Sequence, residues 1–245
     1  INHGIYLTST ATNNTVSGNT TSSDFYGIFL ELGSDTNTVS GNSGSANSYG
    51  IYVDASISNS ITGCTYNSNT IAGFYLINGA SNNLIASSAA SSNVYGIQMQ
   101  SSEKNRIRNN SFNSNTQHGV YLSGTWNNTF HQNTMDSNGR YQVYIDAGTS
   151  SDTFQKNNIR TSPTNPDSGV LNATANVFDF TRNMWNTTDS AAIRNRISGA
   201  GAANIQFQPY RIGVVDTTAG ADTTAPGLPA SVALVLTVTL PVPVP

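Results

Sequence analysis

The sequence predicts an all-β solenoid whose short strands stack in register from one coil to the next. Two observations predict this fold. The segment Gly-Ile-Tyr-Leu at residues 4–7 returns in similar form every 23 residues as far as residue 145. Asn, Ser and Thr supply 92 of the 245 residues, so turn formers are abundant and strong helix formers are too scarce for a helical bundle. Each unit is too short to bury a core alone, and stacking of the units therefore provides the core.

Two strands are predicted in each coil. The first and third residues after each glycine face inward, because side chains alternate along a strand. These inward residues form two apolar columns, Ile5, Ile28, Ile51, Phe74, Ile97, Val120, Val143 and Leu7, Leu30, Val53, Leu76, Met99, Leu122, Ile145. The second strand of each unit is centred on Val16, Val39, Ile61, Ile85, Ile107, Phe130 and Phe154.

Polar residues flank the second strand at constant distances. Two residues before its centre stand Asn14, Asn37, Asn59, Asn83, Asn105, Asn128 and Asp152, and three residues after it stand Asn19, Asn42, Cys64, Ser88, Asn110, Asn133 and Asn157. We expect the side-chain amides to bond to one another from coil to coil, about 4.8 Å apart, and to satisfy the backbone of the turns. Cys64 is then a small, inert buried residue of such a ladder.

The G-I-Y-L and N-T-V-S-G-N pattern over residues 1–160 resembles the right-handed parallel β-helix repeat proteins of the pectate-lyase-like superfamily. The segment Phe-Thr-Arg-Asn-Met-Trp-Asn-Thr-Thr-Asp at residues 180–189 is similar to the caps that end many such helices. The resemblance implies the right-handed twist and defines the fold rather than the function, because lyases, hydrolases, adhesins and fibres share it. The chain looks like a non-catalytic surface or fibre type.

The chain divides into three predicted parts. Residues 1–178 form about eight coils, the last of which starts four residues late after an insertion; residues 179–213 form a C-terminal cap; residues 214–245 form a linker and an extended β-strand tail. We expect Thr188 or Asp189 to cap a short helix through Arg196 across the open end of the core. The tail residues that alternate on one strand face are Val232, Leu234, Leu236, Val238 and Leu240.

Charge and composition exclude several classes of protein. The chain has ten Lys and Arg residues and a net charge of −3, which is too little positive charge for a basic nucleic-acid binder. Residues 1–102 contain no Lys or Arg at all. No apolar run approaches the ~20 residues of a membrane-spanning helix. The single cysteine forms no internal disulfide, so pairing and packing, or assembly, must supply the stability.

The second residue after each glycine should face outward, and at six of seven coils it is aromatic. The aromatic members are Tyr6, Phe29, Tyr52, Tyr75, Tyr121 and Tyr144, and Gln98 replaces the ring in one coil. Three interpretations stay open: stacking between coils, packing of a second subunit or of the tail, and stacking against sugars. The residue just before each glycine is also aromatic in most coils, and we expect that column to pack a corner.

The sequence contains no complete catalytic or metal-binding constellation. Glu31 and Asp54 occupy equivalent outward positions on adjacent coils, at a separation that suits a retaining glycosidase, but exposed or cation-neutralised carboxylates also fit. The segments around His118 and Arg106 are similar to two catalytic segments of the hydrolases in this superfamily. The carboxylates that would complete a hydrolase site are missing, and Asp136 is the nearest candidate. The three histidines and Cys64 lack metal-ligand spacing, so no catalytic residue, metal or cofactor is predicted.

The predicted function is that of an extracellular structural β-solenoid, a surface or filament subunit. Exposed coil edges and the orphaned tail strand favour head-to-tail self-assembly into a homopolymer. The alternative is a carbohydrate-binding or polysaccharide-cleaving module with glycans as partners, and a third option is a passive spacer before a further domain. Six sequons permit N-glycosylation in a secreted or cell-surface protein, at Asn13, Asn19, Asn109, Asn127, Asn172 and Asn186.

Overall fold

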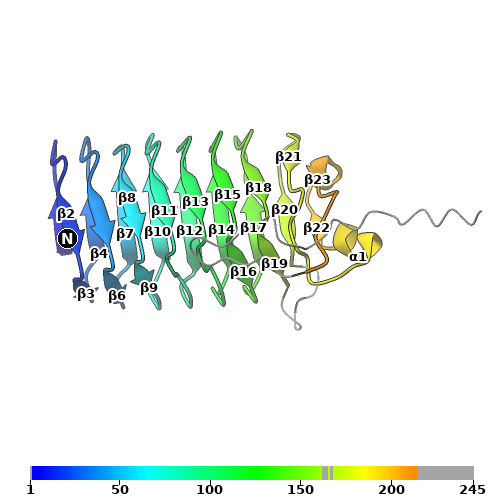
Figure 1. Cartoon of the computed structure of the whole chain (residues 1–245), viewed down its shortest axis with the longest axis horizontal. Coiled ribbons are helices and arrows are strands. Elements are labelled where there is room, and N and C mark those ends of the chain that lie inside the picture. Colours follow the sequence, from blue (N-terminus) through cyan, green and yellow to red (C-terminus); the bar gives the residue numbers. More distant parts are fainter. Residues whose placement is uncertain (1, 162–164, 166–167, 214–245) are drawn as a thin grey trace, which may run out of the picture.

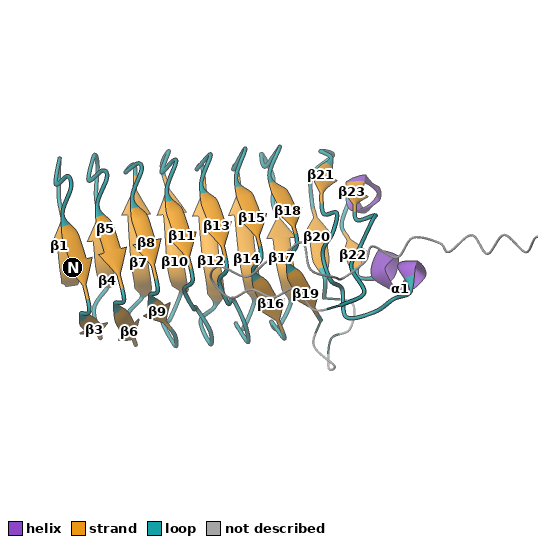
Figure 2. Ribbon diagram, viewed as in Figure 1, coloured by secondary structure: helices purple, strands orange, loops and turns teal. Residues whose placement is uncertain are grey.

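The computed structural model describes residues 2–161, 165 and 168–213, which form one elongated stack of coils (Figure 1). Two nine-stranded parallel sheets run the length of the stack, and shorter strands and bridges form a third face. Figure 2 shows that strands and turns make up nearly all of it, with the short helix α1 at the end opposite the N-terminus. The predicted all-β parallel solenoid is confirmed.

The first sheet contains the longer strands, one from each coil. We number the coils from one to nine by these strands: β1 (His3–Leu7), β4 (Tyr26–Leu30), β7 (Tyr49–Asp54), β10 (Ala72–Ile77), β12 (Tyr95–Gln100), β14 (His118–Ser123), β17 (Tyr141–Ile145), β20 (Val170–Asn172) and β22 (Ile197–Ser198). The register pairs Ile5 with Ile28 and Val120 with Val143, so the predicted 23-residue spacing sets the pairing.

The second sheet follows the same order with strands of two or three residues. Its members are β2 (Thr15–Ser17), β5 (Thr38–Ser40), β8 (Ser60–Thr62), β11 (Leu84–Ala86), β13 (Arg106–Arg108), β15 (Thr129–His131), β18 (Thr153–Gln155), β21 (Phe178–Asp179) and β23 (Ile205–Gln206). The third face contains β3 (Thr20–Ser22), β6 (Ser43–Ser45), β9 (Thr65–Tyr66), β16 (Thr134–Asp136) and β19 (Asn158–Arg160). Isolated bridges through Ala89 and Ser111 connect the two strand groups of this face.

The inward columns form one continuous core along the axis. From Ile28 onward, every member of the first predicted column is fully buried, and the rings of Phe130 and Phe154 stack with centroids 4.3 Å apart. The third face adds large side chains that the sequence analysis missed, among them Tyr66 and Phe112. A side chain at Gly44 would place its Cβ 2.5 Å from the Tyr66 ring, so this position requires glycine.

The predicted amide ladders are confirmed. In the first ladder, Asn105 Nδ2 donates to Asn128 Oδ1 at 3.0 Å and also to the carbonyl oxygen of Ala80 at 2.9 Å. Asn105 Oδ1 in turn accepts from both the backbone N–H and the Nδ2 of Asn83. Each buried amide therefore satisfies its neighbour and a turn carbonyl at once.

The second ladder is interrupted at Cys64, as its sequence predicted. The Cys64 Sγ lies 3.7 Å from the carbonyl oxygen of Val39, and burial raises the pKa of the thiol. A third ladder lies at the remaining turn, where each member again contacts the next, and the sequence analysis missed it although its members are 22 to 24 residues apart. Its members are Asn47, Asn69, Asn93, Asn115 and Asn138.

The C-terminal region differs from the prediction in one respect. Strands β22 and β23 form a ninth coil inside the segment expected to be a cap, since Val170 pairs with Ile197 across a 27-residue unit. The restart four residues late is confirmed, because Val143 pairs with Val170. The predicted helix is α1 (Ser190–Asn195), capped by Asp189, whose carboxylate accepts from the backbone N–H of Ala191. A 3-10 turn, η1 (Ala202–Asn204), precedes β23.

Within the described residues, the structure contains no helix with the length and apolar character of a membrane span. The linker and the tail strand at residues 232–240 lie outside the described residues, as do residues 163 and 166 of the insertion.

We expect Asn105→Ala to destabilise the fold by about 3 to 5 kcal/mol, because it leaves buried donors of Asn83 and the Ala80 carbonyl without partners. Asn14 occupies the same ladder at its exposed end. Asn14→Ala is therefore the matched control, and we expect it to cost less than about 1 kcal/mol. Urea unfolding followed by circular dichroism measures the free energy of unfolding of both variants. Equal losses of stability would contradict the claim that a ladder amide contributes more where it is buried.

Asp152 stands where the first ladder otherwise has Asn, and burial raises the pKa of its carboxyl from 3.8 to about 6. The folded protein therefore favours the protonated form, so this group's contribution to stability is complete below about pH 4 and is lost as the pH rises through about 6. Between pH 4 and pH 8, we expect the free energy of unfolding of the wild type to fall by about 2 to 3 kcal/mol more than that of Asp152→Asn. Parallel pH dependences of the two unfolding free energies would refute this assignment.

Candidate functional site

The outer surface of the first sheet carries two adjacent columns of aromatic side chains. The column just before each glycine lies beside the predicted outward column instead of packing a separate corner. Tyr26 and Phe29 illustrate the reason: Gly27 and Ile28 between them are both buried, so both rings face outward with centroids 4.6 Å apart. We call this surface the aromatic face, and its members are His3, Tyr6, Tyr26, Phe29, Tyr49, Tyr52, Tyr75, Tyr95, His118, Tyr121, Tyr141 and Tyr144.

Rings of successive coils contact one another along the aromatic face. Tyr6 stacks on Phe29 with centroids 5.2 Å apart, and Tyr52 meets Tyr75 edge to face at 5.0 Å. Mutual contact leaves Phe29 and Tyr75 only 7% and 6% exposed, whereas Tyr6 at the end is 43% exposed. Stacking between coils therefore occurs, and the half-exposed rings leave edges and hydroxyl groups for a second molecule.

The aromatic face consists of two clusters, separated where Ala72 and Gln98 replace rings. His118 lies at the centre of the C-terminal cluster, 4.8 Å from the Tyr144 ring and 5.7 Å from the Tyr95 ring. It is only 3% exposed, and burial, together with the nearby Arg140 guanidinium, lowers its pKa to about 4. The imidazole is thus neutral at pH 7 and covered by tyrosine rings.

Some tyrosine hydroxyls donate to acceptors at the end of the strand in the next coil. Tyr75 donates to Gln100 Oε1 at 2.8 Å, and Tyr121 donates to Asp146 Oδ2 at 2.6 Å. Burial raises the pKa of Tyr75 to about 12, and burial followed by the bond to Asp146 raises the pKa of Tyr121. These phenols stay protonated at neutral pH and fix the orientation of the rings.

The two carboxylates considered as a catalytic pair each have a different partner. Leu30 pairs with Val53, so Glu31 and Asp54 follow at the same level in adjacent coils, as predicted. Glu31 accepts hydrogen bonds from the hydroxyls of Tyr6 and Thr8, and Asp54 accepts from Asn78 Nδ2 at 2.8 Å. The bond from Tyr6 attaches Glu31 to the edge of the aromatic face, whereas the partner of Asp54 is not a member of that face.

The histidine and arginine motifs that resemble hydrolase segments are not brought together. His118 lies on β14 of the first sheet, Arg106 and Arg108 lie on β13 of the second sheet, and Asp136 lies on β16 of the third face. His131 lies on β15 and Cys64 is buried, and among the described residues no group of three His, Cys, Asp or Glu side chains could hold a metal ion.

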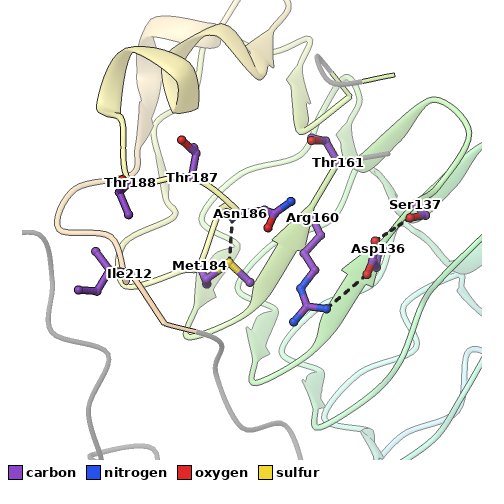
Figure 3. A pocket seen from close by; sticks show the side chains of 9 residues that line it. All are labelled: Asp136, Ser137, Arg160, Thr161, Met184, Asn186, Thr187, Thr188 and Ile212. Carbon is purple, nitrogen blue, oxygen red and sulfur yellow. Dashed lines mark hydrogen bonds and ion pairs between the residues drawn. The ribbon is translucent and has the colours of Figure 1, made fainter. Parts of the chain in front are cut away.

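A cleft of about 640 Å³ lies on the third face near the C-terminal coils (Figure 3). Asp136 and Arg160 are register partners in β16 and β19, and their Oδ2 and Nη1 atoms are 3.5 Å apart. Asp136 also accepts from the Ser137 hydroxyl at 2.7 Å. The other lining residues are Thr161, Met184, Asn186, Thr187, Thr188 and Ile212. The sequence analysis did not predict this cleft. The opposite charges of Asp136 and Arg160, which occupy equivalent positions in coils 24 residues apart, could have indicated it.

Five of the six sequon asparagines lie at least partly on the surface. Asn172 does not: its side chain is fully buried and Nδ2 donates to the carbonyl oxygens of Asn176 and Gly201. A glycan at Asn172 is incompatible with this fold, and that predicted site is corrected. Asn13, Asn19, Asn109, Asn127 and Asn186 stay predictions.

The fold is similar to those of two solved enzymes. One is a periplasmic alginate epimerase, AlgG (T265N mutant), with a TM-score of 0.57 and 14% identity over 76% of this chain and 47% of the epimerase chain. The other is the A-module of the mannuronan C-5 epimerase AlgE4 of Azotobacter vinelandii, with a TM-score of 0.51 and 14% identity over 84% of this chain and 72% of that module. The chain thus spans about half the length of AlgG, and at this identity the likeness shows the fold alone.

No curated protein sequence matches this chain. A family model does match it, twice, at residues 1–88 and at residues 73–207. Together the two matches cover the whole stack of coils. The chain therefore belongs to the right-handed β-helix family described as periplasmic copper-binding protein (NosD).

Proposed function

We propose that this protein is a polysaccharide-binding β-helix module that acts outside the cytoplasm, with the aromatic face as its binding surface. Its fold is similar to that of two enzymes named for alginate and mannuronan, which are polysaccharides. The family is described as periplasmic, and one of the two enzymes is also periplasmic. This likeness favours the carbohydrate interpretation over a structural filament.

The observation that carries the proposal is that two clusters of partly exposed rings, one on coils one to four and one on coils five to seven, follow the axis of the stack. Coils repeat about every 4.8 Å, which is close to the length of one hexose unit, so a glycan chain that lies along the axis meets one coil per sugar. Tyrosine supplies an apolar edge for sugar C–H groups and a hydroxyl for sugar hydroxyls. The Tyr26 and Tyr52 rings, whose centroids are 4.4 Å apart, form such a surface on coils two and three.

Binding rather than cleavage is proposed. A general base must come within hydrogen-bond reach of the proton that it removes. His118 is covered by tyrosine rings, and Glu31 already accepts hydrogen bonds from two hydroxyls. The tight self-contacts of these groups favour a fixed surface over a reacting site.

A copper site is not part of the proposal, because the residues present do not fit one. Copper in proteins is bound by His, Cys and Met side chains. All of these residues of the chain lie in the described part, where the histidines belong to coils one and six and to two different sheets. Cys64 and the three methionines are buried, and the described residues contain no metal-binding cluster of His, Cys, Asp and Glu.

Head-to-tail self-assembly stays a prediction. Its main element, the tail strand at residues 232–240, lies outside the described residues. No observation in the described part favours a second copy of the chain over a glycan on the aromatic face.

The proposal is tested with the full chain by affinity electrophoresis in gels that contain alginate, mannuronan or a neutral β-glucan. We expect retardation in at least one gel, and we expect Tyr52→Ala combined with Tyr144→Ala to weaken binding about tenfold, since each ring contact contributes about 0.5 to 1.5 kcal/mol. Tyr144→Phe keeps the ring and should retain most of the affinity.

The matched control is Val177→Ala, which removes an exposed apolar side chain outside the aromatic face. Thermal melts must show that every variant is folded. Absence of retardation in all three gels, or equal affinity for the double variant and the control, would overturn the proposal.

A further inference from the structure

Four of the ten Lys and Arg residues of this protein lie on one face of coils five to eight. Coils one to four contain no Lys or Arg. The outer surface of the second sheet in coils five to eight carries four cations, Arg106, Arg108, Lys156 and Arg182, with His131 among them. We call these five residues the cationic ridge. Such a concentration is unexpected in a chain with a net charge of −3, since soluble proteins usually intersperse charges of both signs.

The strand register places the cations at the spacing of the coils. Arg108 pairs with His131, and His131 pairs with Gln155, which Lys156 follows directly. Lys156 and Arg182 both adopt left-handed backbone conformations, with φ of 54° and 61°, at the turn that ends the second-sheet segment in coils seven and eight. Burial and then the nearby Lys156 and Arg108 charges lower the pKa of His131, as expected for close neighbours.

Two carboxylates lie near the ridge, and in the described part of the chain neither forms an ion pair with a ridge cation. Glu103 forms an ion pair with Lys104 at 3.1 Å, ahead of β13. Asp179, on β21, accepts a hydrogen bond from Gln155 Nε2. In the described part of the chain, the recorded ion pairs involve neither Arg106 nor Arg108, and both side chains are exposed. Among the described residues, the guanidinium groups of Arg106 and Arg108 thus have no ion-pair partner, and guanidinium groups bind carboxylates in a bidentate manner.

An exposed tryptophan lies beside the ridge. Trp126 precedes β15 and is 37% exposed, and it forms a parallel bridge with Glu103 of the preceding coil. The backbone N–H of Lys104 donates to its carbonyl oxygen at 3.2 Å. Trp126 stands three residues before Thr129, the register partner of Arg106, so an exposed indole lies at the margin of the ridge and adds an apolar platform to its charge, which is the pairing that an acidic sugar requires.

We propose that the cationic ridge, with Trp126, is a binding surface for a linear carboxylated polysaccharide that lies along the axis of the solenoid. The ridge offers four cations over four coils, two in coil five and one each in coils seven and eight, and a polymer with one carboxylate per sugar that lies along the axis presents carboxylates over the same length. Duplex nucleic acid carries one charge per about 1.7 Å and calls for denser positive charge. This surface is on a different sheet from the aromatic face, so the inference does not depend on the proposed function.

The test measures binding of polygalacturonate to the full chain at several salt concentrations, with methyl-esterified polygalacturonate as the uncharged form of the same polymer. We expect the charged polymer to bind and the esterified polymer to bind at least about tenfold more weakly. Arg106→Gln combined with Arg108→Gln should lower the affinity about tenfold and make the plot of log K against log salt shallower by about one to two units.

Two further variants separate the contributions. Trp126→Ala should weaken binding several-fold and leave the salt slope unchanged, because it removes no charge. Arg140→Gln removes an exposed cation outside the ridge and is the matched control. Tyr52→Ala combined with Tyr144→Ala should leave the salt slope of the ridge unchanged, which separates this inference from the aromatic face.

Three results would overturn the inference. They are equal binding of the esterified polymer, no change in affinity or slope for the Arg106 and Arg108 double variant in a folded protein, and tighter binding of a single-stranded polynucleotide that displaces polygalacturonate. The last result would assign the ridge to nucleic acid.

Discussion

Parallel, in-register pairing between coils is the constraint on which the rest of this structure depends. Because each strand bonds to the equivalent strand of its neighbours about 4.8 Å away, every residue lies directly above and below residues at the same place in their coils. Ile28 therefore meets Ile51, and Asn105 meets Asn83 and Asn128. An inward position favours a residue type that can contact itself, which is why the inward columns are nearly uniform.

At buried polar positions, where equivalent residues of successive coils contact one another, the side chain is usually the amide of asparagine. An amide has both a donor and an acceptor, so identical side chains bond to one another without a charge and still supply a donor for a turn carbonyl. Asp152 departs from the rule, and its buried carboxyl accepts from Thr125 and Asn128 with a pKa raised to about 6. Cys64 departs from it as well, and there the ladder loses its side-chain amide.

The outward side chains are the ones that can be adapted to a ligand, because strand pairing does not restrict which residue types occupy those positions. The aromatic face uses self-contact to keep rings partly out of water, whereas the cationic ridge places like charges in adjacent coils at an electrostatic cost. Stacked rings stabilise the solenoid even without a ligand. The exposed guanidinium groups of Arg106 and Arg108 take part in no ion pair among the described residues, so a partner of opposite charge explains them better.

By itself, the sequence determined the fold, the inward columns, two of the three amide ladders and the outward stripe from Tyr6 to Tyr144, because a fixed period converts positions into columns without any knowledge of long-range contacts. The tertiary structure decided what the period does not encode. It placed Tyr26 beside Phe29 instead of at a corner, brought Asp136 to Arg160 in a cleft, buried Asn172 and made a ninth coil from β22 and β23. These outcomes depend on how turns of unequal length close around the core, and the physical reason is that closure is a property of all three faces together.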